Sequence, residues 1–211
     1  MKRFAWVVLA WAASTGVAFA QSPTAADDSK GYIEAVAQAA FGNVSSQSFG
    51  GELGVTIHPG IQIFVDAGYV RDTTTSDLSA NAQRIAADIT AKGGGGSYSV
   101  KQPVTFGVGG IKYYLPVDQS RFAPYVMAGG GAASVQKNVN FAVAHGSVSD
   151  YVTIGSDLAG SETKGMFSAG IGADLAFGKM FVVDLQYRFG RVFTTGGLNI
   201  SRLGAGVGLR F

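Results

Sequence analysis

The last nine residues, Leu203-Gly204-Ala205-Gly206-Val207-Gly208-Leu209-Arg210-Phe211, are the strongest single indication of the fold. Successive side chains of a β-strand point to opposite faces of the sheet. The large apolar side chains therefore share one face, and the other face carries only glycine and Arg210. This strict alternation predicts a strand whose two faces meet different surroundings.

The same alternation recurs in seven further segments, each roughly ten residues long, which is the length of a tilted membrane-spanning strand. They cover residues 32–41, 49–58, 61–69, 100–115, 122–135, 166–177 and 181–189. The pattern blurs at Gly109-Gly110, where we expect a β-bulge. The inward face of the fourth and fifth segments stays undecided.

The connections between these segments differ in length. Short turns are expected at His58-Pro59-Gly60, at 116–121 and at Gly178-Lys179, whereas the long polar stretches 72–99 and 136–163 fall at the opposite end. Backbone polar groups in lipid must all be paired, so the sheet has to close. The fold class predicted is all-β, an eight-stranded antiparallel up-and-down transmembrane β-barrel.

The N-terminus has the pattern of an export signal. Lys2 and Arg3 precede a short apolar core, and Ala18-Phe19-Ala20 fits a small-residue cleavage site. We expect a signal peptide over 1–20, a short periplasmic tail over 21–30 and the barrel over 31–211; an uncleaved N-terminal anchor is the alternative. Without Lys2 and Arg3, 14 basic residues balance 14 acidic ones, so nothing indicates a nucleic-acid partner. The absence of cysteine excludes a lipid-anchored lipoprotein.

With these segments the chain resembles the OmpA/OmpX-like family of eight-stranded outer-membrane barrels. The resemblance is carried by the eight alternating segments, by Lys112-Tyr113-Tyr114 and Pro124-Tyr125-Val126, and by the C-terminal stretch Gly206 to Phe211. It implies the outer membrane of a Gram-negative-type cell as location. The partners implied are outer-membrane lipid, periplasmic chaperones and the barrel-assembly machinery, with Val207, Leu209 and Phe211 as the assembly signal. A lipocalin-like barrel is the rival fold, but its apolar face would point inward.

Turn positions also predict the strand register. A turn over His58 to Gly60 pairs Ile57 with Ile61. That register places Glu52 opposite Asp66. The turn near Gly178 likewise places Asp174 opposite Asp184, and the loop near Thr195 places Arg188 opposite Arg202, so three like-charged pairs face each other. Like charges cannot stand alone in a confined interior, and arginine suits bidentate pairing with carboxylates.

We therefore expect a network across the lumen that plugs the barrel, formed by Glu52, Asp66, Arg188 and Arg202. Nearer the periplasm, Glu34 is expected close to Arg210 across the closing seam, with Asp174 and Asp184 nearby. The alternative is that these charges are solvated in a wet lumen without fixed partners.

No catalytic, cofactor or metal site is predicted. His58 fits a turn, and His145 in His145-Gly146-Ser147 falls in a long loop rather than on a lipid-facing strand. Gly93 to Gly96 lacks the residues of a phosphate cradle and predicts a loop tip. Residues 76–92 carry apolar side chains at helical spacing, so they predict either a short loop helix or an extension of the hairpin above the membrane.

These features favour a structural protein of the outer membrane that presents the loops 72–99 and 136–163 to a surface partner. A narrow porin-like channel for ions or small solutes is the alternative, and a lipid-modifying enzyme is a distant one. The sequence indicates neither the partner nor the oligomeric state.

Overall fold

The structure is a computed structural model that describes residues 30–116, 121–153 and 158–211. The expected signal peptide and nearly all of the tail lie outside these residues. Nine strands are present in the described part: β1 Gly31–Phe41, β2 Ser46–His58, β3 Ile61–Val70, β4 Gly96–Lys101, β5 Val104–Tyr114, β6 Phe122–Val143, β7 Ala159–Phe177, β8 Phe181–Val192 and β9 Leu198–Arg210. One α-helix, α2 Ser76–Ala91, and one 3₁₀ turn, η1 Val148–Asp150, complete them.

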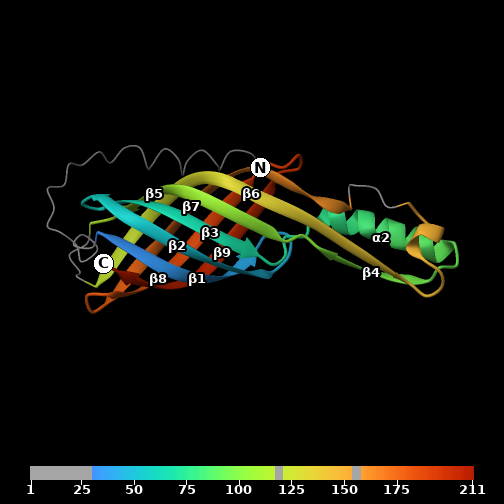
Figure 1. Ribbon diagram of the computed structural model, residues 1–211, viewed down its shortest axis with the longest axis horizontal. Helices are drawn as coiled ribbons and strands as arrows, with labels where there is room; N and C mark the ends of the chain where they lie inside the picture. The colour runs from blue at the N-terminus through green and yellow to red at the C-terminus, as the bar shows by residue number, and fades with distance from the viewer. Residues whose placement is uncertain (1–29, 117–120, 154–157) are drawn as a thin grey trace, which may run out of the picture.

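Eight of these strands form a closed antiparallel ring in the order β1-β2-β3-β5-β6-β7-β8-β9, with β9 pairing back to β1 (Figure 1). The seam is the continuous ladder between β1 and β9, and two backbone hydrogen bonds of 3.0 Å between Gly31 and Phe211 close one end of it. The tight turns after β2 and β7 lie at the same end of the barrel as Gly31 and Phe211, and we call this end the turn end. The fold class expected from the alternation is thus confirmed.

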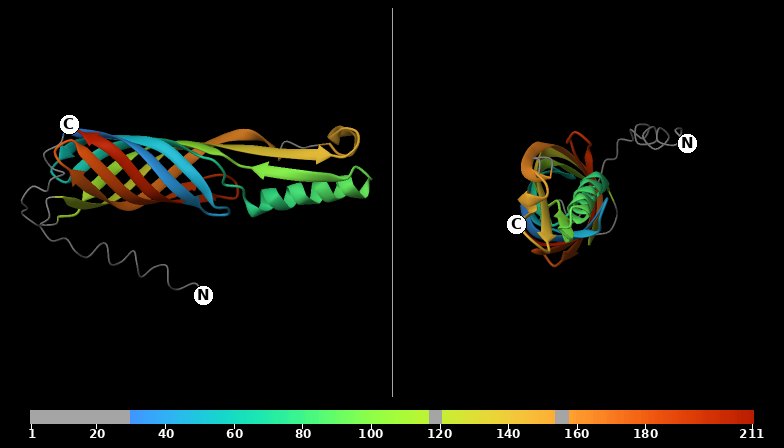
Figure 2. Two further views of the ribbon diagram at one scale, coloured as in Figure 1. Left: turned by 90° about the horizontal axis from the view of Figure 1, so that it is seen from below. Right: turned by 90° about the vertical axis from the view of Figure 1, so that its right-hand side faces the viewer.

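The ring does not account for the whole sheet. β6 continues beyond the ring, and β4 pairs with its last residues, from Asn138 to Val143. Together with α2 and η1 these segments form a projection, here called the arm, that continues the long axis of the barrel away from the turn end (Figure 2). Of the two expectations for residues 76–92, the helix is confirmed, because α2 covers Ser76–Ala91. The extended hairpin is formed by β4 and the end of β6 instead.

The helix of the arm begins and packs as its sequence dictates. The Thr75 hydroxyl accepts a hydrogen bond of 3.3 Å from the Leu78 backbone N–H and so caps the N-terminus. The buried residues Leu78, Ala82, Ala86 and Ile89 recur at helical spacing on one face. Within the described residues, no helix combines the length and the apolar character needed to cross a bilayer.

Two local expectations were wrong. Ile61 pairs with His58 rather than with Ile57, because a bulge lies between Thr56 and His58. No bulge occurs at Gly109-Gly110, since β5 pairs with β3 and β6 in one continuous register. The even-numbered residues of β5 and the odd-numbered residues of β6 are the buried ones, which settles the faces that the sequence left undecided.

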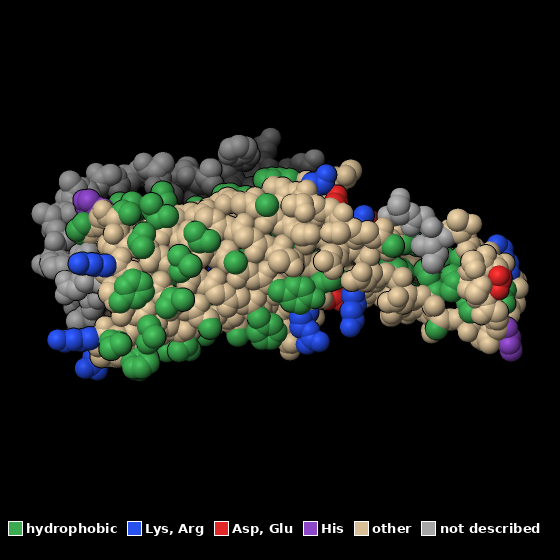
Figure 3. All heavy atoms as spheres, viewed as in Figure 1, with side chains coloured by type: hydrophobic (Ala, Val, Ile, Leu, Met, Phe, Trp, Pro, Cys, Tyr) green, Lys and Arg blue, Asp and Glu red, His purple; other side chains and the backbone are tan. Residues whose placement is uncertain are grey.

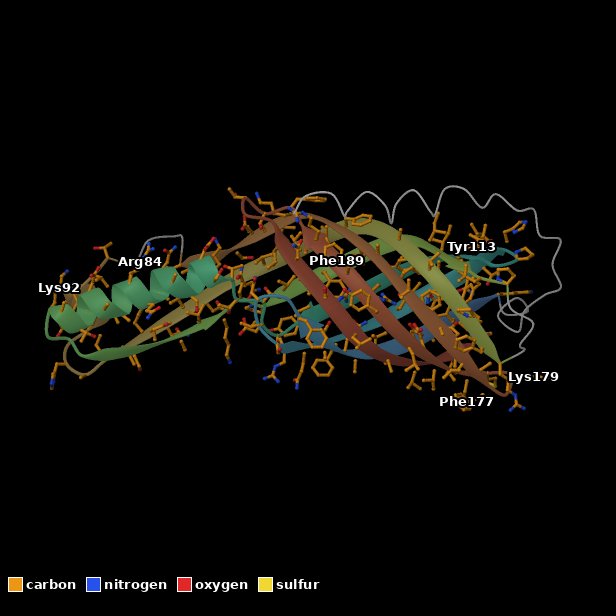
Figure 4. All side chains as sticks on the ribbon, turned by 180° about the vertical axis from the view of Figure 1, so that it is seen from behind. Arg84, Lys92, Tyr113, Phe177, Lys179 and Phe189 are labelled. Atoms are coloured by element: carbon orange, nitrogen blue, oxygen red, sulfur yellow. The ribbon has the colours of Figure 1, made fainter. Side chains whose placement is uncertain are left out.

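The outer wall of the ring is apolar. On the face shown in Figure 3, hydrophobic side chains are scattered over the wall, and Lys and Arg side chains lie toward its two ends. Exposed aromatic residues gather toward the ends: Phe41, Phe49, Tyr69, Phe167 and Phe193 toward the arm, and Tyr113, Phe122, Phe177, Phe181 and Phe211 toward the turns. Tyr113 and Phe177 mark the turn end in Figure 4. Aromatic girdles around an apolar band are typical of barrels that span the outer membrane.

Candidate functional site

The interior of the ring is built around a central cluster of five charged side chains: Glu52, Asp66, Lys112, Arg188 and Arg202. All are at most 3% exposed. The register that brings four of them together is the one expected, since Glu52 lies opposite Asp66 and Arg188 lies opposite Arg202. Glycines on the same inward face leave the space that these long side chains need.

Arg188 is the centre of this cluster. Its guanidinium reaches two carboxylates at once, pairing through Nη2 with Glu52 Oε2 and through Nη1 with Asp66 Oδ2, the latter at 2.7 Å. Arg202 approaches the same Asp66 oxygen at 3.5 Å, and its guanidinium carbon lies 4.2 Å from the centre of the Phe106 ring. Each like-charged pair is thus separated by charges of the other sign.

Lys112 is the member of the cluster that the sequence reasoning missed. Its ammonium pairs with Glu52 Oε1 at 2.8 Å and lies 4.6 Å and 4.3 Å from the ring centres of Tyr32 and Tyr125. Cation–π contacts of this kind hold a cation in a water-poor site. Because Lys112 alternates with the outward residues Ile111 and Tyr113, the signal was present, but the glycines beside it obscured the inward face.

A second group of charges, the lower cluster, lies nearer the turn end. Asp174 faces Asp184 across the β7–β8 pair. Asp184 accepts hydrogen bonds of 2.8 Å and 2.7 Å from the Tyr125 hydroxyl. Asp174 accepts one of 2.8 Å from Tyr114, and Arg210 pairs with the same oxygen at 2.8 Å.

Glu34 stands opposite Gly208, two positions from Arg210 on the same inward face of β9, so it lies near Arg210 across the seam as expected, but it does not pair with it. Arg210 stands in register with Tyr32 and pairs with Asp174, and the ion pairs among the described residues do not include Glu34 with Arg210. The Glu34 carboxyl instead lies over Gly206, where a Cβ would come within 3.1 Å of its Cδ. Its Oε1 is buried without a hydrogen-bond partner in the described part of the chain.

Above the ring, a hydrogen-bonded junction ties the arm to the rim. The Asp72 carboxylate accepts from the Thr74 backbone N–H at 2.9 Å, from the Thr74 hydroxyl at 2.6 Å and from the Gln102 backbone N–H at 3.0 Å. Thr73 donates its N–H and its hydroxyl to the Gln102 carbonyl at 2.8 Å and 2.7 Å. The two ends of the connecting segment 72–102 are therefore hydrogen bonded to each other.

The arm end of the barrel also carries a polar pocket of about 400 Å³. It lies between the start of α2, the loop after β8 and the adjoining parts of β6 and β7. Its lining includes Asn43, Ser76, Asp77, Lys137, Glu162 and Thr195. Hydroxyl, amide and charged groups thus surround the entrance to the lumen.

The described residues contain no group of three or more His, Asp or Glu side chains arranged to hold a metal ion. His58 is exposed and its Nδ1 lies 3.0 Å from the Pro59 carbonyl oxygen, as suits a turn residue. The Ser147 hydroxyl is hydrogen bonded to Ser149 at 2.8 Å rather than to His145. Among the residues that the structure describes, these contacts give neither histidine a nucleophilic partner.

The family model for the outer membrane protein beta-barrel domain matches residues 10–211. The chain belongs to this family. Its location is accordingly the outer membrane, and the closed ring with its two aromatic girdles is the membrane-spanning unit.

Two solved structures show the same fold as this family member. Neisserial surface protein A is 16% identical, with 87% of this chain and 98% of that chain covered and a TM-score of 0.59. The N-terminal β-barrel domain of OprF from Pseudomonas aeruginosa is 16% identical, with 86% and 96% covered and a TM-score of 0.54. No curated protein sequence matches this chain.

Proposed function

We propose that this protein is a surface-contact protein of the outer membrane, in which the barrel is the anchor and the arm is the contact surface. In outer-membrane barrels the short turns face the periplasm and the long connections face outward. By this rule Phe211 and the tight turns lie on the periplasmic side, and the arm lies outside the cell. The location of Arg84 and Lys92 on the arm, far from Tyr113 and Lys179, is visible in Figure 4.

The observation that carries the proposal is that the described parts of both long connections are folded. α2, β4 and the end of β6 form one packed unit, and the Asp72 junction fastens it to the rim. A loop that served only to join two strands would need a few residues. A folded projection on a rigid scaffold is the arrangement that binding proteins use to present a surface.

A plugged lumen would support the same function. An eight-stranded barrel has an interior that side chains can fill, and here the largest fully buried side chains include Arg188, Arg202, Tyr125, Phe64 and Lys112. We propose that the central cluster plugs the barrel. The barrel would then serve as an anchor without an open path for solutes.

The proposal is tested by removing the arm and measuring adhesion. Thr73 is hydrogen bonded to Gln102, and Asn138 is paired with Ala159, so a two-residue Asn-Gly turn can replace 74–101 and another can replace 139–158. Cells that carry this variant should lose binding to other cells or to matrix while the barrel still folds and resists denaturation on gels. The substitution Lys179→Ser at the turn end is the matched control and should leave adhesion unchanged.

A narrow channel is the second candidate, and one observation favours it. Near the lower cluster, the side-chain amide of Gln186 and Glu34 Oε1 are buried without hydrogen-bond partners in the described residues. Buried polar groups of this kind are usually satisfied by water, which would extend a wet path part of the way through the barrel. Single-channel recording distinguishes a narrow channel from a plugged anchor. Steady conductance of the unaltered protein would favour the channel over the surface-contact function.

A further inference from the structure

The strand β4 has an open edge. Its six residues, Gly96–Lys101, pair with β6 on one side, and β4 stands at the end of the strand order of the sheet. In the described part of the chain, no backbone group bonds to the other side of this strand. An open edge presents a row of unpaired N–H and C=O groups that can accept another strand.

The register identifies which groups face outward. The flanking bonds from Ala144 N–H to the Gly95 carbonyl and from Gln136 N–H to the Pro103 carbonyl fix the phase of the ladder. Residues directly opposite in an antiparallel pair alternate between bonded and non-bonded positions. Ser97, Ser99 and Lys101 therefore bond to β6, while Gly96, Tyr98 and Val100 turn their backbone groups to the open side.

The central residues of this edge carry little protection against pairing, although β4 is short and ends at Lys101. Natural edge strands are commonly protected by charges, proline or bulges, yet residues 96–100 contain none of these. The helix covers a face of the two-stranded arm rather than its edge, since a Cβ on Gly96 would contact Ile89 Cγ2 at 3.7 Å (Figure 2). The opposite face carries the exposed residues Ser97, Ser99, Lys101, Asn138 and Asn140.

We propose that this edge binds the same edge of a second copy of the chain, with the two β4 strands antiparallel and Tyr98 opposite Tyr98 of the second copy. This symmetric register places Gly96 opposite Val100 and Ser97 opposite Ser99. Lys101 falls opposite Gly95, so no like charges meet. The product is a four-stranded sheet with both helices on one face, which is a more stable unit than an isolated two-stranded ribbon.

The direction of the arm decides where the two copies sit. The arm continues the barrel axis, so the β4 strands of two copies in one membrane point the same way (Figure 1). Antiparallel pairing requires the two barrels to lie at opposite ends of the joined sheet. The contact therefore links copies in two facing membranes, and many weak pairs between two surfaces act together.

This inference rests on the proposed function, because it requires the arm to lie outside the cell. The chain contains no cysteine, so introduced cysteines report contacts without background. Outer-membrane vesicles bearing Ser97→Cys are mixed with vesicles bearing Ser99→Cys under mild oxidation. We expect disulfide-linked dimers in this mixture and none in either population alone, because residues at identical positions 97 or 99 lie too far apart to be bridged.

Two further variants complete the test. Tyr98→Pro removes an N–H that faces away from β6, so it should abolish the cross-link and leave the arm folded. Ala87→Cys, on the exposed side of α2, should give no dimer with Ser97→Cys. Dimers within a single Ser97→Cys population, or no dimer in the mixture, would overturn antiparallel pairing between membranes.

Adhesion of the arm-deleted protein, measured beside the cross-link, separates the two proposals. Loss of adhesion without a 97–99 cross-link leaves the surface-contact function standing and rejects self-pairing. Unchanged adhesion together with no cross-link rejects both.

Discussion

Arg188 and Arg202 lie directly opposite each other on neighbouring strands and share one carboxylate, that of Asp66. Two guanidinium groups this close are tolerated because Glu52 also pairs with Arg188 and because Arg202 rests on the Phe106 ring. Removing one side chain from such a cluster leaves the others buried and uncompensated.

We therefore expect Arg188→Ala to destabilise the barrel by about 3–5 kcal/mol, the usual cost of breaking a buried ion pair from one side. The same variant should raise ion leakage in planar bilayers, since it removes the side chain at the centre of the plug. Urea unfolding and single-channel recording measure the two effects. Arg84→Ala on the exposed face of α2 is the control, and unchanged stability together with unchanged leakage in Arg188→Ala would reject the plug.

Glycines inside and outside the barrel should respond differently to substitution. A Cβ at Gly54 would lie 2.7 Å from Tyr32 Cζ, so Gly54→Val displaces a ring that binds Glu52 and should cost about 1–3 kcal/mol. Nothing lies within 4 Å of a Cβ at the outward Gly107. Gly107→Ala should be neutral or stabilise slightly, and thermal unfolding followed on gels compares the two; equal losses would contradict the inward placement of Tyr32.

The Asp72 junction should control the arm without affecting the ring. Asp72→Ala removes three hydrogen bonds and should loosen the base of the arm by about 1–3 kcal/mol. Limited proteolysis should cut between 76 and 101 faster in this variant, while the thermal unfolding of the barrel stays as in the original protein. Thr75→Ala, which removes only the helix cap, should have a smaller effect of about 1 kcal/mol.

One turn of the arm should respond to acid. The Ser147 backbone N–H donates a hydrogen bond of 2.7 Å to the Asp150 carboxylate, which lowers the pKa of that group below its ordinary value. A carboxylate with a lowered pKa stabilises the turn at pH values above its ordinary pKa, and this contribution is lost as the pH falls through the lowered value. The protection of the Ser147 amide against hydrogen exchange, measured relative to its intrinsic exchange rate at each pH, should therefore decrease in acid. In Asp150→Asn this acid step should be absent; if it persists, another group is responsible.

The C-terminal residue should matter for assembly more than for the folded barrel. Phe211 is outward and 71% exposed, so its side chain adds little to the interior. Phe211→Ala should lower the amount of protein that reaches the outer membrane, as measured by fractionation, if the terminal aromatic is read by the assembly machinery. Phe181→Ala, an outward aromatic at the same end, is the control, and equal yields for the two variants would argue against a terminal signal.

The ring and most of its register could be predicted because alternation and turn position are local properties of the sequence. Glu52 opposite Asp66, Asp174 opposite Asp184 and Arg188 opposite Arg202 all follow from the position of a turn or loop between two strands. The bulge next to His58 was not predicted. It lies between Glu52 and the turn, so it leaves the pairing of Glu52 with Asp66 unchanged.

Contacts across the lumen were harder to predict, because they depend on strands far apart in the sequence. Lys112 was missed since β5 carries glycine on both faces and its inward side could not be read. Arg210 reaches Asp174, 36 residues away, rather than Glu34. The arm combines a helix with a short strand, and polar composition alone does not distinguish such a unit from an irregular loop.

The length of β6 has a consequence for spacing. This strand has 22 residues, whereas a membrane-spanning strand needs about 9–11. The α2 helix of 16 residues adds about 24 Å of height beside its outer part. The arm therefore sets a distance as well as offering a surface. A partner bound at its tip is held at a fixed distance from the bilayer. Two membranes joined through the arm would be separated by a gap that the length of the strand determines.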